Sequence, residues 1–393
     1  MKTMKWKFYS LAFVAGMSIL TACSSDDNND NDGNDGNGNG NEIENGTILK
    51  GTITSDVTLA AGNTYKLSGE YIVEEGATLH IEEGVKIIAV YDDIADYILV
   101  KQGGKINAVG TPDKPIVMTS EKEEPGAWGG IHICGRAHTN AEGGKGSSEI
   151  GGAVYGGNDD ADNSGTLQYI RLEYTGFAFD EEHEANGISF YGVGNGTIVD
   201  HCQAYKGSDD GFEFFGGSVN VSNLVAVSCS DDSFDWTEGW NGKGTNLVAY
   251  QEDKSTLGYD CDCLMECDNN GSNKAATPVA HPVLKNLILV GNGGSKQGIR
   301  LRAGTEVEID NAKVCGKGQP LTVETALTEN ALKNGTSKLT NITLTSELSS
   351  KEGIYTHADF IAVTSNKVDA NLSYSSFEDI RKECSWMNGS WVK

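Results

Sequence analysis

Two pairs of adjacent aspartates are the groups in this sequence best placed to do chemistry. Asp209-Asp210 and Asp231-Asp232 are 22 residues apart, and each pair is followed at the same interval by another acid, Glu213 or Asp235. Clustered carboxylates bind divalent cations, or act as acid and base when their pKa values are driven apart. The spacing indicates a fold that superposes segments 22 residues apart.

Three interpretations of these acids are open. The first is a calcium site, because Ca²⁺ prefers six to eight oxygen ligands; the candidate ligands are Asp209, Asp210, Glu213, Asp231, Asp232, Asp235 and Glu266. The second is catalysis by Asp209, Asp210, Asp231 and Asp232 with Arg300. The third is a solvated acidic face without a ligand, neutralised at one end by Arg300. No organic cofactor is indicated.

A repeat in the chain explains how such acids could meet. Asparagine followed by a short, mostly apolar run recurs at Asn223, Asn246, Asn286, Asn311 and Asn341, and Tyr169 and His201 begin two more runs in the same frame. From Tyr169 the steps are 32, 22, 23, 40, 25 and 30 residues. One coil of a β-helix needs roughly 20 residues, and loop insertions explain the longer steps. The chain is therefore predicted to be all-β, a single right-handed parallel β-helix with a stacked asparagine ladder.

A second class of strand-like run alternates with the first. Its second and fourth residues are predicted to point inward and stack in two core columns: Ile188, Phe212, Phe234, Met265 and Ile299, and Phe190, Phe214, Trp236, Cys267 and Leu301. The residues between them point outward, as Ser189, Glu213, Asp235, Glu266 and Arg300. Three carboxylates are thus expected on adjacent coils, about 4.8 Å apart.

The catalytic interpretation has two forms. A hydrolase similar to polygalacturonases would have aspartates on neighbouring coils, followed by a histidine and then a basic strand. The segment Arg300-Leu301-Arg302 matches the expected basic strand. The expected Gly-His-Gly is missing, and His281 lies beside Pro282. A β-helix lyase would instead use Arg300 as the base beside calcium-binding carboxylates. An acidic face opposes binding of an anionic polysaccharide unless calcium bridges the two.

Aromatic residues near the acids suggest sugar binding. Phe215 and Trp240 fall outside the core alternation, and Tyr259 lies in the next coil. Their rings could stack on sugar rings or pack under loops. Nearby, an outward stripe of Val225, Val248 and Ile288 is expected to be covered by a loop or the C-terminal segment, or to form a contact surface.

Eight cysteines follow Cys23 in the chain: Cys134, Cys202, Cys229, Cys261, Cys263, Cys267, Cys315 and Cys384. Some pairing is open in an exported protein. Cys261, Cys263 and Cys267 could ligate a soft metal, but their spacing is not that of a zinc motif.

The N-terminal residues predict export and lipidation. Residues 1–22 carry lysines followed by an apolar run too short to span a bilayer, which is typical of a signal peptide. Leu20-Thr21-Ala22-Cys23 resembles a bacterial lipobox, which implies lipidation of Cys23. Residues 23–46 then form a flexible acidic Asn/Asp/Gly tether. The net charge of −26 opposes binding to nucleic acid, so the membrane contact would come from the lipid.

Residues 47–393 are assigned to the β-helix. Residues 135–165 are glycine-rich and are expected to form a long excursion loop. From about residue 326 the chain is expected to add further coils, and the segment Trp386–Trp391 is expected to cap the open end.

Four motifs resemble a family of right-handed parallel β-helix surface lipoproteins of Bacteroidetes and related bacteria. They are the runs 75–79, 126–131, 156–158 and 208–217, the last reading SDDGFEFFGG. The acidic residues after Cys23 also resemble the surface-export signal of such lipoproteins. The resemblance implies an outer-membrane, outward-facing location and assigns no activity. We therefore expect a non-enzymatic surface protein that binds glycan or a host or matrix component. The alternative is a lyase or hydrolase of acidic polysaccharide.

Overall fold

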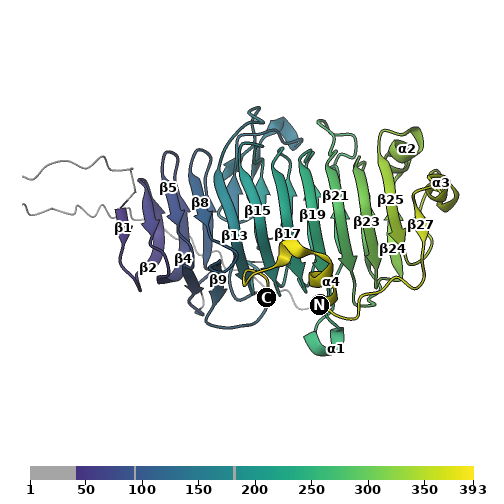
Figure 1. The fold of residues 1–393 in the computed structure, drawn as a ribbon. Helices are drawn as coiled ribbons and strands as arrows, with labels where there is room; N and C mark the ends of the chain where they lie inside the picture. The colour runs from purple at the N-terminus through teal and green to yellow at the C-terminus, as the bar shows by residue number, and fades with distance from the viewer. Residues whose placement is uncertain (1–40, 93, 180–182) are drawn as a thin grey trace, which may run out of the picture. The chain divides into compact units, whose positions relative to one another are not determined.

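The computed structural model describes residues 41–393 except 93 and 180–182, and these form a parallel β-helix (Figure 1). The predicted signal peptide and the lipidation site at Cys23 lie outside the described residues. Strand β1 falls within the segment assigned to the tether and pairs with β3, so the β-helix begins at residue 41 rather than at 47. Among the described residues, no helix is long and apolar enough to cross a membrane.

Each coil contributes to three strand faces. The first face contains β1 (Asn41–Ile43), β3 (Val57–Leu59), β5 (Thr78–Ile81), β8 (Lys105–Val109) and the first halves of β13 (Gly165–Glu173), β15 (Ile198–Tyr205), β17 (Asn220–Val227), β19 (Lys243–Tyr250), β21 (Val283–Val290), β23 (Glu308–Cys315) and β25 (Lys338–Leu344). The second contains the first halves of β2 (Ile48–Ile53) and β4 (Thr64–Val73), then β6 (Lys86–Ala89), β9 (Ile116–Ser120), the second halves of β13 to β25, and β27 (Lys367–Val368).

The third face carries the predicted acids. It contains the second halves of β2 and β4, then β7 (Tyr97–Val100), β10 (Ile131–Cys134), β14 (Ile188–Tyr191), β16 (Phe212–Phe215), β18 (Phe234–Thr237), β20 (Met265–Cys267), β22 (Gln297–Leu301), β24 (Gln319–Val323) and β26 (Ser349–Ser350). The described part of the chain also contains the helices α1 (Lys254–Leu257), α2 (Ala326–Asn334), α3 (His357–Ala362) and α4 (Phe377–Glu383), with 3-10 turns at Glu142–Gly144 and Ser385–Met387.

The repeating asparagines mark the bend between the first and second faces. Each of the seven residues in this frame, from Tyr169 to Asn341, has a positive φ between 51° and 62°. Asparagine tolerates this left-handed conformation, and its amide both donates and accepts hydrogen bonds. The Nδ2 groups of Asn246, Asn286 and Asn311 donate to the preceding asparagine's Oδ1 over 2.8, 3.0 and 2.9 Å.

The ladder is shorter than predicted. Asn223 donates at one end to Asp200 (2.7 Å). Asn341 donates to Asp310 (2.6 Å) instead of to Asn311, because this nearby carboxylate is the stronger acceptor. Four of the five predicted asparagines therefore form the ladder.

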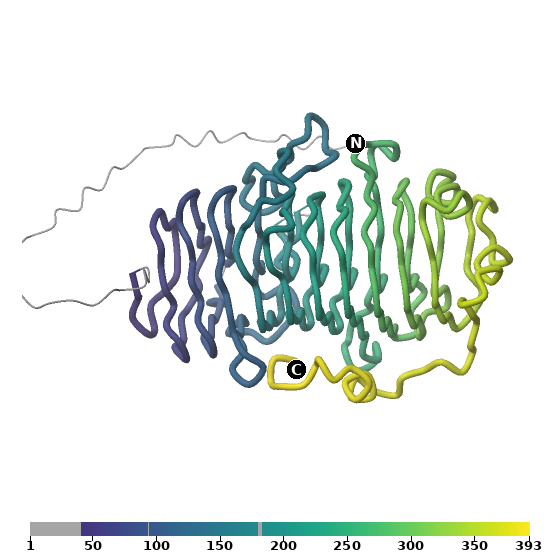
Figure 2. The backbone as a smooth tube through the Cα atoms, turned by 45° about the horizontal axis from the view of Figure 1, so that its top comes forward, coloured from purple at the N-terminus to yellow at the C-terminus, as the bar shows by residue number. Residues whose placement is uncertain are grey.

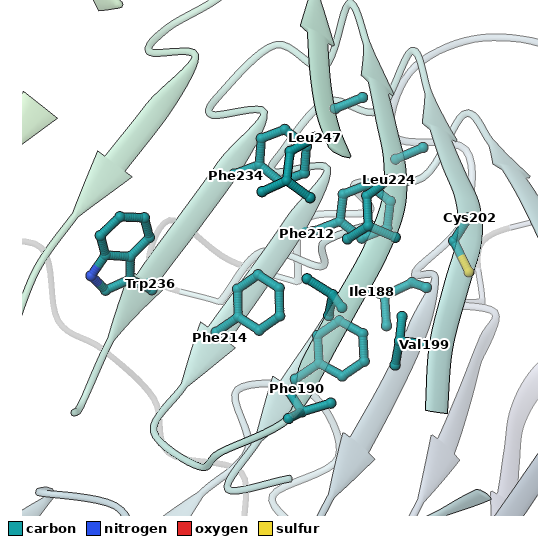
Figure 3. Packing of buried hydrophobic residues seen from close by; sticks show 14 of the residues in the cluster. Ile188, Phe190, Val199, Cys202, Phe212, Phe214, Leu224, Phe234, Trp236 and Leu247 are labelled. Atoms are coloured by element: carbon teal, nitrogen blue, oxygen red, sulfur yellow. The ribbon is translucent and has the colours of Figure 1, made fainter. Parts of the chain in front are cut away.

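The two predicted core columns are confirmed. The register pairs Phe190 with Phe214, Phe214 with Trp236, and Trp236 with Cys267. Figure 3 shows the aromatic and aliphatic side chains in files inside the coil. The Phe190 and Phe214 rings stack with centroids 5.0 Å apart. Each such buried side chain stabilises the fold by roughly 1.5–3 kcal/mol.

The C-terminal segment does not cap the last coil as predicted. Figures 1 and 2 show residues after β27 running back along the side of the β-helix. There Met387 and Trp391 pack on the stripe of Val225, Val248 and Ile288. Burial of this apolar stripe favours the side position. Helix α3 lies instead at the end of the coil, with Phe360 fully buried.

Candidate functional site

The outward column on the third face forms as the alternation predicts. Parallel pairing places Ser189 beside Glu213, Glu213 beside Asp235, Asp235 beside Glu266, and Glu266 beside Arg300. Each strand contributes one residue because neighbouring strands share register. Segments far apart in the chain thus place three acids on consecutive strands.

The turns before these strands place a second column of acids beside the first. Hydrogen bonds between successive turns explain why this column contains aspartates. The backbone N–H of Asp232 donates to Oδ1 of Asp210 (2.8 Å), and that of Cys263 donates to Oδ1 of Asp232 (2.6 Å). The N–H of Asp210 donates in turn to Oδ1 of Asn186 (3.2 Å). One oxygen of each aspartate therefore stabilises the next turn. Sequence reasoning missed Asn186, although Asn186-Gly187 matches Asp210-Gly211 in position.

The two columns converge into one carboxylate cluster. Ligand atoms lie within 4.8 Å of one another in three groups of predicted acids: Asp209, Asp210 and Asp231; Asp210, Glu213 and Asp235; Asp232, Asp235 and Glu266. All seven residues predicted as metal ligands are thus brought together. A fourth group adds Asp262 and Cys263 to Asp232, which the sequence analysis did not include.

Burial makes this cluster electrostatically costly. It raises the pKa of Asp210, Glu213, Asp232 and Asp235 well above the ordinary carboxyl range, and repulsion between the acids raises it further. Burial and the charge of Asp231 raise the pKa of Asp209 to about 8. Oδ1 of Asp235 is shielded from solvent and has no hydrogen-bond partner among the described residues. Such an atom lacks the compensation that a buried charge requires.

The excursion loop packs on part of the third face. It forms a small antiparallel hairpin of β11 (Gly146–Ser147) and β12 (Val154–Tyr155). Its Ile150 and Tyr155 belong to one buried apolar cluster with Tyr191 and Phe215 of the third face. It also supplies Glu149, whose Oε2 accepts a hydrogen bond from the Tyr191 hydroxyl (3.3 Å). Burial raises the pKa of Glu149 to about 7. Nothing in the repeat could have identified Glu149, because the loop lies outside it.

Arg300 and Arg302, which follow the acids in the chain, both form ion pairs with carboxylates. Arg300 bonds to Glu266 (2.8 Å) and Glu324 (3.1 Å), and Arg302 bonds to Asp268 (2.7 Å) and to Glu266. Burial lowers the pKa of Arg300, but the bonds to Glu324 and Glu266 outweigh it and the net shift is upward. A guanidinium held in this way is a poor general base, since a base must give up its proton. The geometry therefore disfavours the role predicted for Arg300 in a lyase.

Two of the three predicted sugar-stacking aromatics, Phe215 and Trp240, are buried, whereas Tyr259 is half-buried. Trp240 is 1 % exposed and stacks on Phe214 with centroids 4.1 Å apart. Phe215 is 7 % exposed and stacks on Tyr191 at 4.4 Å. The Tyr259 hydroxyl donates to the Ser228 carbonyl (2.7 Å). The rings of Trp240 and Phe215 serve packing, because Trp240 belongs to the core of the coil and Phe215 to the apolar cluster under the excursion loop.

The eight cysteines of the described residues are all free and buried. Burial raises the pKa of the Cys263 and Cys267 thiols, which opposes formation of the thiolate that zinc requires. Cys267 lies in the core column, whereas Cys263 donates to Asp262 (3.3 Å). Cys261, Cys263 and Cys267 therefore do not form a common metal site.

Comparison with known proteins gives one match. A family model described as "Pectate-lyase like beta helix domain" matches residues 51–392. No curated protein and no solved structure matches the chain.

Proposed function

Because this chain belongs to the pectate-lyase-like β-helix family, we propose that it binds polysaccharide without cleaving it. In this proposal a divalent cation in the carboxylate cluster stabilises the β-helix. The family is consistent with a polysaccharide-related role, and the site geometry disfavours cleavage by elimination.

The pairing of both arginines with carboxylates is the observation that argues against cleavage by elimination. Elimination requires a base that removes a proton from the sugar, and Arg300 and Arg302 are each held by two carboxylates. His132 on the same face is fully buried, and burial lowers its pKa to about 4. Its ring bonds to Ser189 and Gly129. None of these three residues is poised to exchange a proton with a bound sugar.

The cation is proposed from the state of Asp235. This residue belongs to two of the close carboxylate groups, and its buried Oδ1 has no partner among the described residues. A hard cation with oxygen ligands, such as Ca²⁺, would satisfy that atom and offset the repulsion. Asp210, Glu213, Asp232 and Glu266 would supply the remaining protein oxygens.

The proposed location rests on the N-terminal sequence. The lipobox at residues 20–23 supports anchoring through a lipid on Cys23. The acidic residues that follow support exposure on the outer face of the outer membrane. The rigid β-helix would then present its surface to glycans outside the cell.

Incubation of the purified protein with a panel of neutral and acidic polysaccharides, with and without EDTA, tests the proposal. We expect retention on at least one polysaccharide, no new reducing ends or unsaturated products, and a rise in melting temperature with calcium. Replacing Glu213 and Asp235 together by Ser should abolish that rise. Release of oligosaccharides by the wild-type protein would establish the enzymatic alternative instead.

A further inference from the structure

A polar cleft lies at the end of β18, between the excursion loop and the loop that follows β20. Its volume is about 650 Å³, and its walls include Asn140, Glu142, Thr237, Glu238 and Asn270. This volume is in the range of small-molecule sites, about 300–1,000 Å³. The cleft was not predicted, because two loops of irregular length form it.

Hydrogen bonds fix the walls of the cleft. Nδ2 of Asn140 donates to Oδ1 of Asn269 (2.8 Å), and Nδ2 of Asn270 donates to Oδ1 of Asn140 (3.0 Å). Asn269 is fully buried, and its Oδ1 also accepts from the Ala280 N–H (2.8 Å). The N–H of Asn140 donates to the Glu238 carbonyl (3.0 Å). The two loops are therefore held together without a ligand, which lowers the entropic cost of binding one.

Several polar groups in the cleft remain free. Glu238 accepts hydrogen bonds from Thr139 and Tyr155 on Oε2 (2.7 and 2.8 Å), and no other described residue donates to its Oε1. The side chains of Glu142, Thr237 and Ser272 make no hydrogen bond to another described residue. A set of carboxylate, hydroxyl and amide groups suits sugar hydroxyls, which both donate and accept.

The negative charge of the cleft disfavours anionic ligands. Among the described residues that line it there are two carboxylates, Glu142 and Glu238, and no lysine, arginine or aromatic side chain. These two negative charges oppose binding of a uronate, and the repulsion is stronger where solvent is excluded. We propose that this cleft is the subsite that binds sugar units of an uncharged polysaccharide, an inference that rests on the proposed polysaccharide-binding function.

Gly271 offers a clean way to block the cleft. It lines the cleft, has no positive φ, and a Cβ built on it would meet no atom within 4 Å. Gly271→Phe should therefore fill the cleft without disturbing the fold. Gly318 also has no positive φ and no neighbour within 4 Å, and it lies in the turn before β24, outside the cleft. Gly318→Phe is the matched control.

Affinity for neutral and uronic-acid polysaccharides would be measured by calorimetry in excess calcium, with circular dichroism to confirm folding. We expect wild type to prefer a neutral polysaccharide, Gly271→Phe to weaken binding about ten-fold or more, and Gly318→Phe to bind as wild type. Thr237→Val, which keeps the side-chain shape, should weaken binding several-fold and tests the cleft if Gly271→Phe does not fold.

The outcomes separate the two proposals. Wild-type binding that Gly271→Phe and Thr237→Val leave unchanged would overturn the cleft assignment and leave polysaccharide binding in place. Preference of the wild type for a uronate or a cationic amino sugar would overturn the neutral ligand class. Binding of no polysaccharide would overturn the proposed function itself.

Discussion

Replacing Asp235 by asparagine should stabilise the cation-free protein and reduce the stabilisation that calcium provides. The carboxylate belongs to two groups whose oxygens lie within 4.8 Å, so it faces four other acids. At an effective dielectric constant of about 20, each charged pair at that distance repels by about 3 kcal/mol. Protonation limits the total: neutralising one carboxyl at pH 8 costs about 5 kcal/mol when its ordinary pKa is about 4.

The neighbouring acids can also take up protons and so reduce the repulsion that Asp235 feels. We therefore expect Asp235→Asn to stabilise the cation-free protein by about 2–4 kcal/mol at pH 8. For a chain of this size that is a rise of about 3–6 °C in melting temperature. In saturating calcium the variant lacks one charged ligand, so its calcium-induced shift should be smaller than that of wild type. Scanning fluorimetry in EDTA and in a calcium titration measures both quantities.

Asp200→Asn is the matched control of opposite sign. Burial raises the pKa of Asp200, but hydrogen bonds from His201, Ser222 and Asn223 outweigh it and the net shift is downward. Its charge is thus stabilising, and the control should lower the melting temperature in both buffers. If Asp235→Asn lowered the melting temperature in EDTA as much as in calcium, mutual repulsion would not describe the cluster.

Three further predictions concern the cluster, the ladder and the C-terminal segment. In EDTA the protein should melt at a lower temperature at pH 8 than at pH 5. The folded-state pKa values of Asp209 (about 8) and Glu149 (about 7) are raised, so the stability that these groups contribute at low pH is lost as pH rises through those values. A melting temperature that did not change with pH would contradict this prediction. Asn246→Ala should lower the free energy of unfolding by about 3 kcal/mol, because two hydrogen bonds are lost and alanine is strained at the positive φ. Asn246→Gly should lower it by about 1 kcal/mol less, because glycine adopts this φ without strain. Equal losses for the two variants in denaturant unfolding would exclude the backbone contribution. Trp391→Ala should weaken the packing of the C-terminal segment by about 3–5 kcal/mol and speed proteolysis of that segment. An unchanged rate of proteolysis would show that other contacts keep the segment on the β-helix.

The period of the sequence predicted the parts of the site that lie on strands. Glu213, Asp235 and Glu266 could be placed together because each follows an inward aromatic or aliphatic residue in the same frame. Strand alternation and coil length are local properties, so they are readable without coordinates. Glu149 and the cleft at Asn270 could not be found this way, since irregular loops carry them.

The sequence by itself determined the β-helix, the asparagine frame and the convergence of seven acids, because a repeat fixes which residues superpose. Only the tertiary structure decided what covers the faces. Trp240 turned into the core, the C-terminal segment packed on the Val225 stripe, and Arg300 paired with carboxylates on both sides. These outcomes depend on contacts between segments of unequal length and on competition for buried surface, neither of which a repeat encodes.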